Sequence, residues 1–119
     1  MEEFKEWLRK AEEDFDTAKY NLEGNKLAAG VFFLQQSVEK SLKALIIKKK
    51  GEIVRTHDLI ILGKRINAPK KIMEYCKELT PAYQYTRYPD VPREEKLGER
   101  ADVLVSYAEE VLEWVKKNI

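Results

Sequence analysis

The stretch GVFFLQQSVEKSLKALIIKKKG, residues 30–51, decides how this chain folds. Its apolar residues recur at helical spacing, so we predict one continuous helix over residues 26–50 with apolar side chains on two opposite sides. A helix of this kind has to be covered twice, either by its own fold or by a second copy of the chain. We predict that it lies between its own bundle and a twin. The two sides are formed by Leu27, Val31, Leu34, Val38, Leu42 and Leu45 and by Ala29, Phe33, Ala44 and Ile47.

The rest of the chain shows helical periodicity and no strand signal. Gly24 and Asn25 separate the first helix from the second, and the short connection makes the two antiparallel. Thr80 and Pro81 end or redirect the fourth helix, and the tyrosine-rich stretch after them is typical of a structured loop. We therefore predict an all-α, up-and-down bundle of four to five helices that occupies residues 1–119 as one domain. The predicted helices cover about residues 1–22, 26–50, 58–66, 72–79 and 94–117, and the predicted loop covers residues 82–92.

Composition argues against several classes of protein. The 119 residues include one cysteine, Cys76, and one histidine, His57, so no disulfide is available and no metal-ligand spacing is present. The N-terminus carries acids where a signal peptide needs bases, and no apolar run approaches the roughly 20 residues of a membrane span. We expect a soluble, cytoplasmic protein without a membrane segment, a metal ion or a cofactor.

The net charge of +1 hides an uneven distribution. Residues 1–23 carry four bases and eight acids, and residues 94–119 carry four bases and seven acids. Residues 48–71 reverse this ratio, with eight bases against Glu52 and Asp58. This basic stretch either attracts phosphate groups or forms a solvated face that the acidic terminal helices balance.

A polar strip on the second helix contains the first candidate binding residues. Helical spacing puts Gln36 beside Lys40 and Glu39 beside Lys43. Amide and ammonium groups in this arrangement suit contacts to phosphates or bases. The alternative, which the spacing itself favours, is an exposed face of ion pairs. Gln35 falls on the apolar stripe instead, and we predict that it is buried with a hydrogen-bond partner.

The motif RTHDL, residues 55–59, contains the second group of candidates. His57 has the chemistry of a general acid or base near neutral pH, and Arg55 has the charge to stabilise a phosphoryl anion. The alternative is a helix N-terminus whose polar residues satisfy backbone N–H groups, with Thr56 or Asp58 as the N-cap. Spacing supplies no nucleophile and no second base beside His57.

The predicted loop AYQYTRYPDVP, residues 82–92, contains the third group. Its aromatic side chains alternate with a base, a combination that stacks on nucleobases and clamps RNA ends. The alternative is a set of tyrosines that covers the hydrophobic core. The candidates in this loop are Tyr83, Tyr85, Arg87, Tyr88 and Asp90.

These motifs, in this order, resemble the HEPN family, the higher eukaryote and prokaryote nucleotide-binding domain. The resemblance covers nearly the whole chain and is carried by AEEDFDTAKYNL (residues 11–22), AAGVFFLQQSVEKSLKALI (28–46), RTHDL (55–59), TRYPDVP (86–92) and the final helix. It implies a bundle of four to five helices that pairs as a homodimer. It also implies a partner, a minimal nucleotidyltransferase protein, with which small prokaryotic members form a toxin–antitoxin or similar two-component system.

Many HEPN proteins are metal-independent ribonucleases that use an arginine, four to six intervening residues and a histidine, brought together across the dimer. This chain departs from that pattern, because Lys50, Gly51 and Glu52 stand where the arginine before His57 is needed. Arg87 is followed at the corresponding distances by Pro92, Arg93 and Glu94. RNA cleavage therefore needs another geometry, such as Arg55 with His57.

The leading hypothesis is a non-catalytic, dimeric HEPN-family protein that binds a nucleotide or the nucleotidyltransferase partner. The predicted ligand-binding residues are Gln36, Lys40, Lys43, Arg55, His57, Asp58, Tyr85, Arg87 and Tyr88. The first alternative is a divergent ribonuclease toxin in which Arg55 and His57 are catalytic. The second alternative is a dimerisation scaffold without a ligand.

Overall fold

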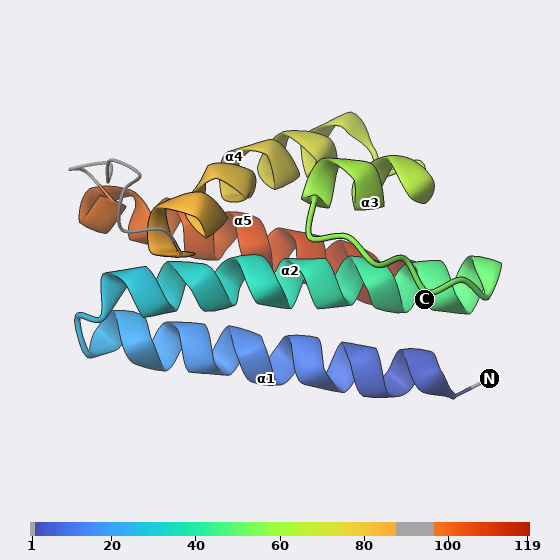
Figure 1. The fold of residues 1–119 in the computed structure, drawn as a ribbon, viewed down its shortest axis with the longest axis horizontal. Helices are drawn as coiled ribbons and strands as arrows, with labels where there is room; N and C mark the ends of the chain where they lie inside the picture. Colours follow the sequence, from blue (N-terminus) through green and yellow to red (C-terminus); the bar gives the residue numbers. More distant parts are fainter. Residues whose placement is uncertain (1, 88–96) are drawn as a thin grey trace.

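The computed structural model describes the backbone of residues 2–87 and 97–119 and the side chains of residues 2–80 and 100–119 (Figure 1). These residues form five α-helices and no strand, which confirms the all-α bundle. The helices are α1 (Glu3–Glu23), α2 (Leu27–Lys50), α3 (Leu59–Arg65), α4 (Lys70–Arg87) and α5 (Leu97–Asn118).

Helix α2 is the centre of the fold and contacts each of the other helices. It runs antiparallel to α1 in Figure 1, while α3, α4 and α5 cover its other sides. Ala44 and Ile47, from the second apolar side, are buried within the single chain, and Phe33 is half-buried. The single chain therefore covers the second apolar side fully at Ala44 and Ile47 and only partly at Phe33. Dimerisation stays a prediction without support from this helix.

The connection from α2 to α3 positions the candidate site. Gly51 ends α2 in the left-handed region at φ 65°, which glycine adopts without steric cost, and its N–H donates to Ile47 O at 2.9 Å. Residues 51–58 then run without regular structure back over α2. Asp58 is the N-cap of α3, since its Oδ1 accepts from the N–H groups of Ile60 and Ile61. This confirms one of the two predicted caps.

Helix α4 is longer than the sequence predicts. Its backbone remains helical through Thr80 and Pro81 as far as Arg87, so the predicted loop over residues 82–87 is wrong. Proline removes one backbone donor from a helix, and a helix held by its packing can tolerate this loss. Thr80 Oγ1 donates to Cys76 O at 2.7 Å, inside the turn that leads into the proline. Residues 88–92 of the predicted loop lie outside the described residues.

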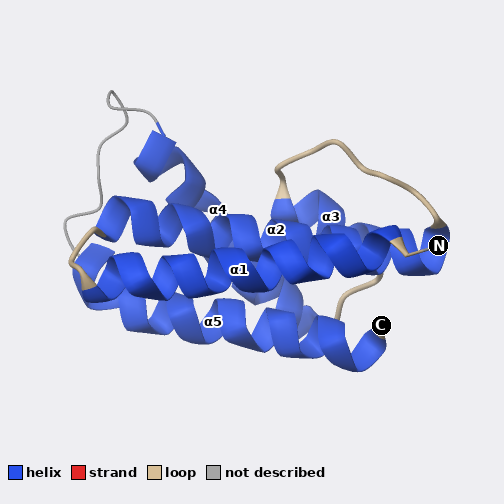
Figure 2. Cartoon of the chain, turned by 90° about the horizontal axis from the view of Figure 1, so that it is seen from below, coloured by secondary structure: helices blue, strands red, loops and turns tan. Residues whose placement is uncertain are grey.

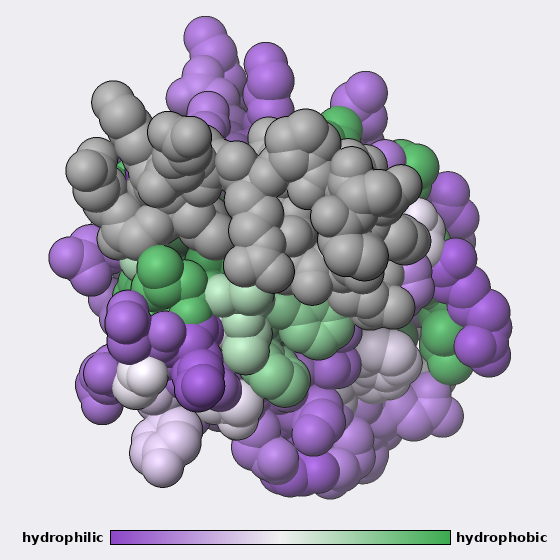
Figure 3. Space-filling model, turned by 60° about the vertical axis from the view of Figure 1, so that its left-hand side comes forward, coloured by the Kyte–Doolittle hydropathy of each residue, from purple (hydrophilic) through white to green (hydrophobic). Residues whose placement is uncertain are grey.

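An apolar stripe runs along α5 over residues 101–115. Its side chains join those of α2, α3 and α4 in one core. Figure 2 shows that the N-terminus of α1, the end of α2 and the C-terminus lie at one end of the bundle. At the other end, hydrophilic side chains form most of the rim and apolar residues lie nearer the centre (Figure 3). The buried members of the stripe are Ala101, Leu104, Ala108, Val111 and Val115.

Candidate functional site

The side chain of Glu39 is a buried carboxylate below His57. Its oxygens lie 3.0 and 3.1 Å from His57 Nδ1, and its side chain is only 5% exposed. Because a carboxylate accepts, Nδ1 carries the proton in this contact, and the neutral imidazole then has its lone pair on Nε2. The imidazole itself is 64% exposed. A carboxylate buried in α2 therefore fixes the tautomer and the orientation of a histidine at the surface.

Gln35 holds the backbone of the same histidine. Its Nε2 donates to His57 O at 3.1 Å, and the glutamine is buried, as the sequence predicts. Gln35 and Glu39 are four residues apart on one side of α2, so one hydrogen-bonds the backbone and the other the ring. The segment that carries the RTHDL motif is thus attached to α2 at His57.

Lys43 completes this network. Its Nζ donates to Glu39 Oε2 at 2.9 Å, and its side chain is 8% exposed. Nζ also lies 5.7 Å from the centroid of the Trp7 ring of α1. The predicted pair of Glu39 and Lys43 is confirmed, but the predicted exposed face is wrong here, because α1 and residues 51–58 cover it. Removing one member of such a buried pair typically costs about 3–5 kcal/mol.

A pocket of about 320 Å³ opens above this network, within the size range of small-molecule sites. Three cationic or titratable side chains, Lys43, Arg55 and His57, line it together with the indole of Trp7. Among the residues that the structure describes, the lining includes no carboxylate. The remaining lining residues are Ile53, Val54 and Thr56.

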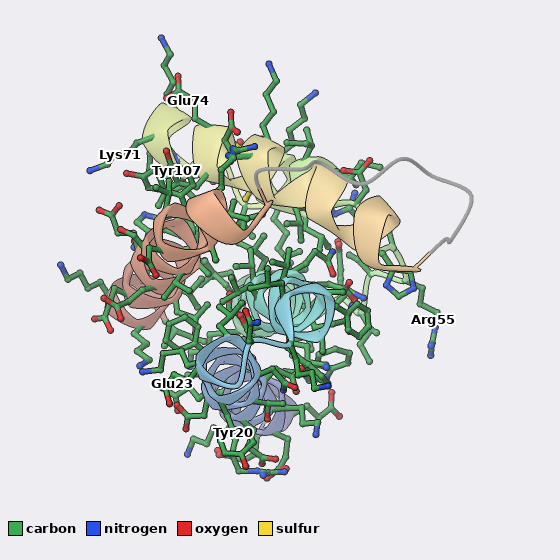
Figure 4. The ribbon with its side chains drawn as sticks, turned by 90° about the vertical axis from the view of Figure 1, so that its left-hand side faces the viewer. Tyr20, Glu23, Arg55, Lys71, Glu74 and Tyr107 are labelled. Carbon is green, nitrogen blue, oxygen red and sulfur yellow. The ribbon has the colours of Figure 1, made fainter. Side chains whose placement is uncertain are left out.

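Arg55 is the exposed cation of this pocket. It is exposed, and in Figure 4 its side chain extends away from the helices. Within the described part of the chain it forms no ion pair. A guanidinium without a carboxylate partner can give all its donors to an anionic ligand. The sequence candidates Lys43, Arg55 and His57 are therefore brought together.

Other predicted site residues lie elsewhere or have structural roles. Lys40 forms an ion pair with the buried Asp14 of α1, and Gln36 Nε2 donates to Gln35 Oε1 at 3.0 Å, so the predicted proximity of Gln36 and Lys40 creates no shared site. Asp58 is occupied as the cap of α3. The side chains of Tyr83, Tyr85, Arg87, Tyr88 and Asp90 lie outside the described residues.

A search for other chemistry among the described residues has two negative results. No group of histidine, cysteine and carboxylate side chains there can hold a metal ion. No helix in that part of the chain is long and apolar enough to cross a membrane. Burial raises the pKa of the Cys76 thiol to about 12, so this thiol stays protonated and unreactive at neutral pH.

Comparison with known proteins assigns the family. The family model described as the HEPN domain matches residues 4–118. The chain belongs to the HEPN family. A protein of Methanocaldococcus jannaschii that is named as a candidate toxin is 32% identical, with 92% of this chain and 84% of that protein covered.

Two crystal structures have the same HEPN-like fold as this chain. A structure described as an archaeal HEPN homologue has a TM-score of 0.79 at 30% identity and covers 96% of this chain and 95% of its own. A Thermus thermophilus protein has a TM-score of 0.87 at 24% identity, with both chains fully covered, and this likeness concerns the fold alone.

Sequence reasoning missed two residues of this candidate site. Helical spacing does not distinguish Trp7 from the other apolar residues of the first helix, and it predicts Glu39 only as the partner of Lys43. The spacing of Lys43 and Trp7 across two helices depends on how α1 and α2 pack, which no local pattern gives. The contact from Glu39 to His57 needs residues 51–58 to turn back over α2, and the glycine at the end of α2 is the only sequence signal of that turn.

Proposed function

We propose that this chain is the HEPN component of a toxin–antitoxin-like two-component system and that it binds the phosphate group of a nucleotide without catalysing a reaction. One observation carries the binding proposal, namely the pocket in which Lys43, Arg55 and His57 converge beside Trp7. The name of the M. jannaschii relative supports the toxin-like role.

The chemistry of the pocket favours a ligand with an anionic end and an apolar end. Arg55 offers N–H donors to phosphate oxygens, and Lys43 adds positive charge nearby. Trp7 and Ile53 offer an apolar surface of the kind on which a nucleobase packs. Glu39 reduces the field of Lys43, so Arg55 is the principal phosphate ligand in this proposal.

Calorimetric titration with AMP, ADP and ATP tests the binding. We expect saturable binding that Arg55→Ala weakens about tenfold, the size of one charged hydrogen bond. Lys64→Ala is the matched control, because Lys64 is an exposed cation of the same basic stretch outside the pocket. Absence of heat at millimolar nucleotide, or equal losses in both variants, would contradict the proposal.

The proposed partner is a minimal nucleotidyltransferase protein, as is typical of small prokaryotic HEPN proteins. The experiment is to express this chain in a bacterial host, alone and together with a minimal nucleotidyltransferase protein taken from the neighbouring reading frame if that frame encodes one. We expect growth to slow with the chain alone and to recover with the pair, which should also copurify. Normal growth in every case, without a complex, would refute the two-component role.

A homodimer is part of the same proposal. Light scattering coupled to size-exclusion chromatography measures the mass directly, and we expect twice the 14.0 kDa of one chain. A monomer across the accessible concentration range would remove the dimer while leaving the pocket unaffected.

A second candidate function is cleavage of RNA by Arg55 and His57. It is favoured by one observation, that Glu39 orients His57 within a pocket that Arg55 also lines. Incubation of labelled RNA with the purified protein and with His57→Ala distinguishes the two functions. We expect the labelled RNA to stay intact with both proteins. Cleavage that disappears in His57→Ala would replace the non-catalytic proposal with the ribonuclease.

A further inference from the structure

One wall of the pocket is a segment without regular structure. Residues 53–57 supply five of the seven residues that line the pocket, and the helices supply Trp7 and Lys43. Figure 1 shows this segment crossing from the end of α2 to the start of α3. We propose that residues 52–55 form a flap that opens to admit the ligand and closes against it, an inference that rests on the proposed nucleotide binding.

Contacts of unlike strength hold the two ends of the segment. At one end, the buried Gln35 and Glu39 bind the backbone and the ring of His57. At the other end, Glu52 Oε2 accepts from Nε and Nη2 of Arg65 in α3 at 2.8 and 2.6 Å. These two side chains are 40% and 50% exposed, and water screens such a pair, whereas a buried network is costly to break. The segment should therefore open at Glu52 and pivot at His57.

The backbone on either side of the flap is fixed. Gly51 ends α2 with a φ of 65°, and its N–H is bonded to Ile47 O. On the far side, Asp58 caps α3 and the fully buried Leu59 begins it. Between these points, Val54 packs against the core and is half-buried. Among the described residues, opening therefore breaks an exposed ion pair and a partial apolar contact, as is typical of a segment with low local stability.

Opening would divide the pocket into a fixed part and a moving part. Trp7 and Lys43 stay in place, because they belong to α1 and α2. Ile53 and Arg55 move with the flap, and Ile53 is already 52% exposed in the closed position. A nucleotide can therefore enter against Trp7 and Lys43 before Arg55 closes on its phosphate. In this order of events the flap controls both the rate of entry and the rate of release.

Hydrogen exchange measured by NMR without a ligand tests the opening. Glu52→Gln removes the charge that holds the weaker end and should speed exchange of the amides of residues 52–55 about threefold, the size of an exposed ion pair. The thermal midpoint and the exchange rates in α5 should not change. Arg65→Gln should have the same effect, and the reversed pair, Glu52→Arg with Arg65→Glu, should restore the parent rates.

Glu78→Gln is the matched control. Glu78 of α4 accepts from Arg100 Nη2 of α5 at 2.8 Å, so it also belongs to an exposed pair of arginine and glutamate that joins two elements. Neither residue lines the pocket. We expect parent exchange rates in residues 52–55 of this variant. Equal acceleration in Glu52→Gln and Glu78→Gln, or no acceleration in either, would show that Glu52 does not hold a flap.

Binding kinetics of AMP test the gating. Stopped-flow fluorescence of Trp7 in a Trp114→Phe background follows binding, because the chain has two tryptophans and Trp7 lines the pocket. In Glu52→Gln, the association and dissociation rate constants should each rise about threefold and leave Kd unchanged, because the ion pair acts on the path of the ligand and not on the bound contacts. An ion pair that only positions Arg55 would instead raise the dissociation rate alone and weaken binding.

The outcomes separate this inference from the proposed function. Unchanged AMP kinetics in Glu52→Gln, or weaker binding through dissociation alone, would overturn the flap and leave nucleotide binding standing. Absence of AMP binding to the parent chain would overturn the proposed function and the gating role together. Opening of the flap is read from exchange in the ligand-free chain and does not depend on that result.

Discussion

Two sides of α2 are buried by different means. The apolar side, represented by Val38, Leu42 and Leu45, joins the core cluster that also contains residues of α3, α4 and α5. The pocket side consists of Gln35, Glu39 and Lys43, whose polar groups bond to one another and to His57. Burial on the apolar side needs only shape, whereas on the pocket side every group needs a particular partner.

This difference separates stability from function along one helix. A core of aliphatic side chains tolerates changes that conserve volume, and its loss is felt across the whole molecule. A buried network of ions contributes little net stability when complete and costs much when broken. The pocket side therefore holds residues 51–58 in place, and breaking its network should loosen this segment. The apolar side keeps the whole bundle folded.

The largest effect is expected on the apolar side. Leu42 is fully buried, so Leu42→Ala should lower the free energy of unfolding by about 3–4 kcal/mol through lost burial and a cavity. Denaturant titration measures this change. Nucleotide affinity of the folded fraction should remain as in the parent chain. A loss of affinity without a loss of stability would show that the two sides are not separate.

Lys43→Met should cost slightly less stability, about 3 kcal/mol, because it leaves Glu39 buried with His57 as its remaining partner. It should also weaken nucleotide binding. The double variant Glu39→Gln with Lys43→Met removes both charges and should recover at least half of the lost stability. Additive losses in this double-mutant cycle, measured by denaturant titration, would mean that the pair is not coupled.

The contrast also explains what the sequence could predict. The bounds of α2, the cap at Asp58 and the burial of Gln35 follow from local patterns, because each depends on spacing within a few residues. Burial of Glu39 depends instead on a segment 18 residues away in sequence that returns over α2. Thr80 and Pro81 predict a helix end that the structure does not have, since the backbone of α4 stays helical as far as Arg87.

The thiol of Cys76 allows the effect of burial on stability to be measured, because burial is the cause of its raised pKa. Burial raises the pKa of its thiol to about 12, so the unfolded chain loses the thiol proton from about pH 9 while the folded chain keeps it until about pH 12. Stability should therefore fall as pH rises through this window, by up to about 1.4 kcal/mol per pH unit from this group. Cys76→Ala should have a flatter profile than the parent chain in denaturant titrations between pH 8 and pH 11. Parallel profiles would show that the thiol is not held neutral by burial.

The smallest effect is expected from the hydrogen bond between the Gln35 side chain and the backbone carbonyl of His57. Gln35→Met keeps the length of the side chain but removes the donor to His57 O, so the global cost should be about 1 kcal/mol. The change should be local, since Glu39 still binds the His57 ring and the apolar side is intact. Hydrogen exchange should become faster in residues 51–58 and stay unchanged in α5. Faster exchange in both regions would mean that Gln35 supports the whole bundle, and the division of α2 into two independent sides would be wrong.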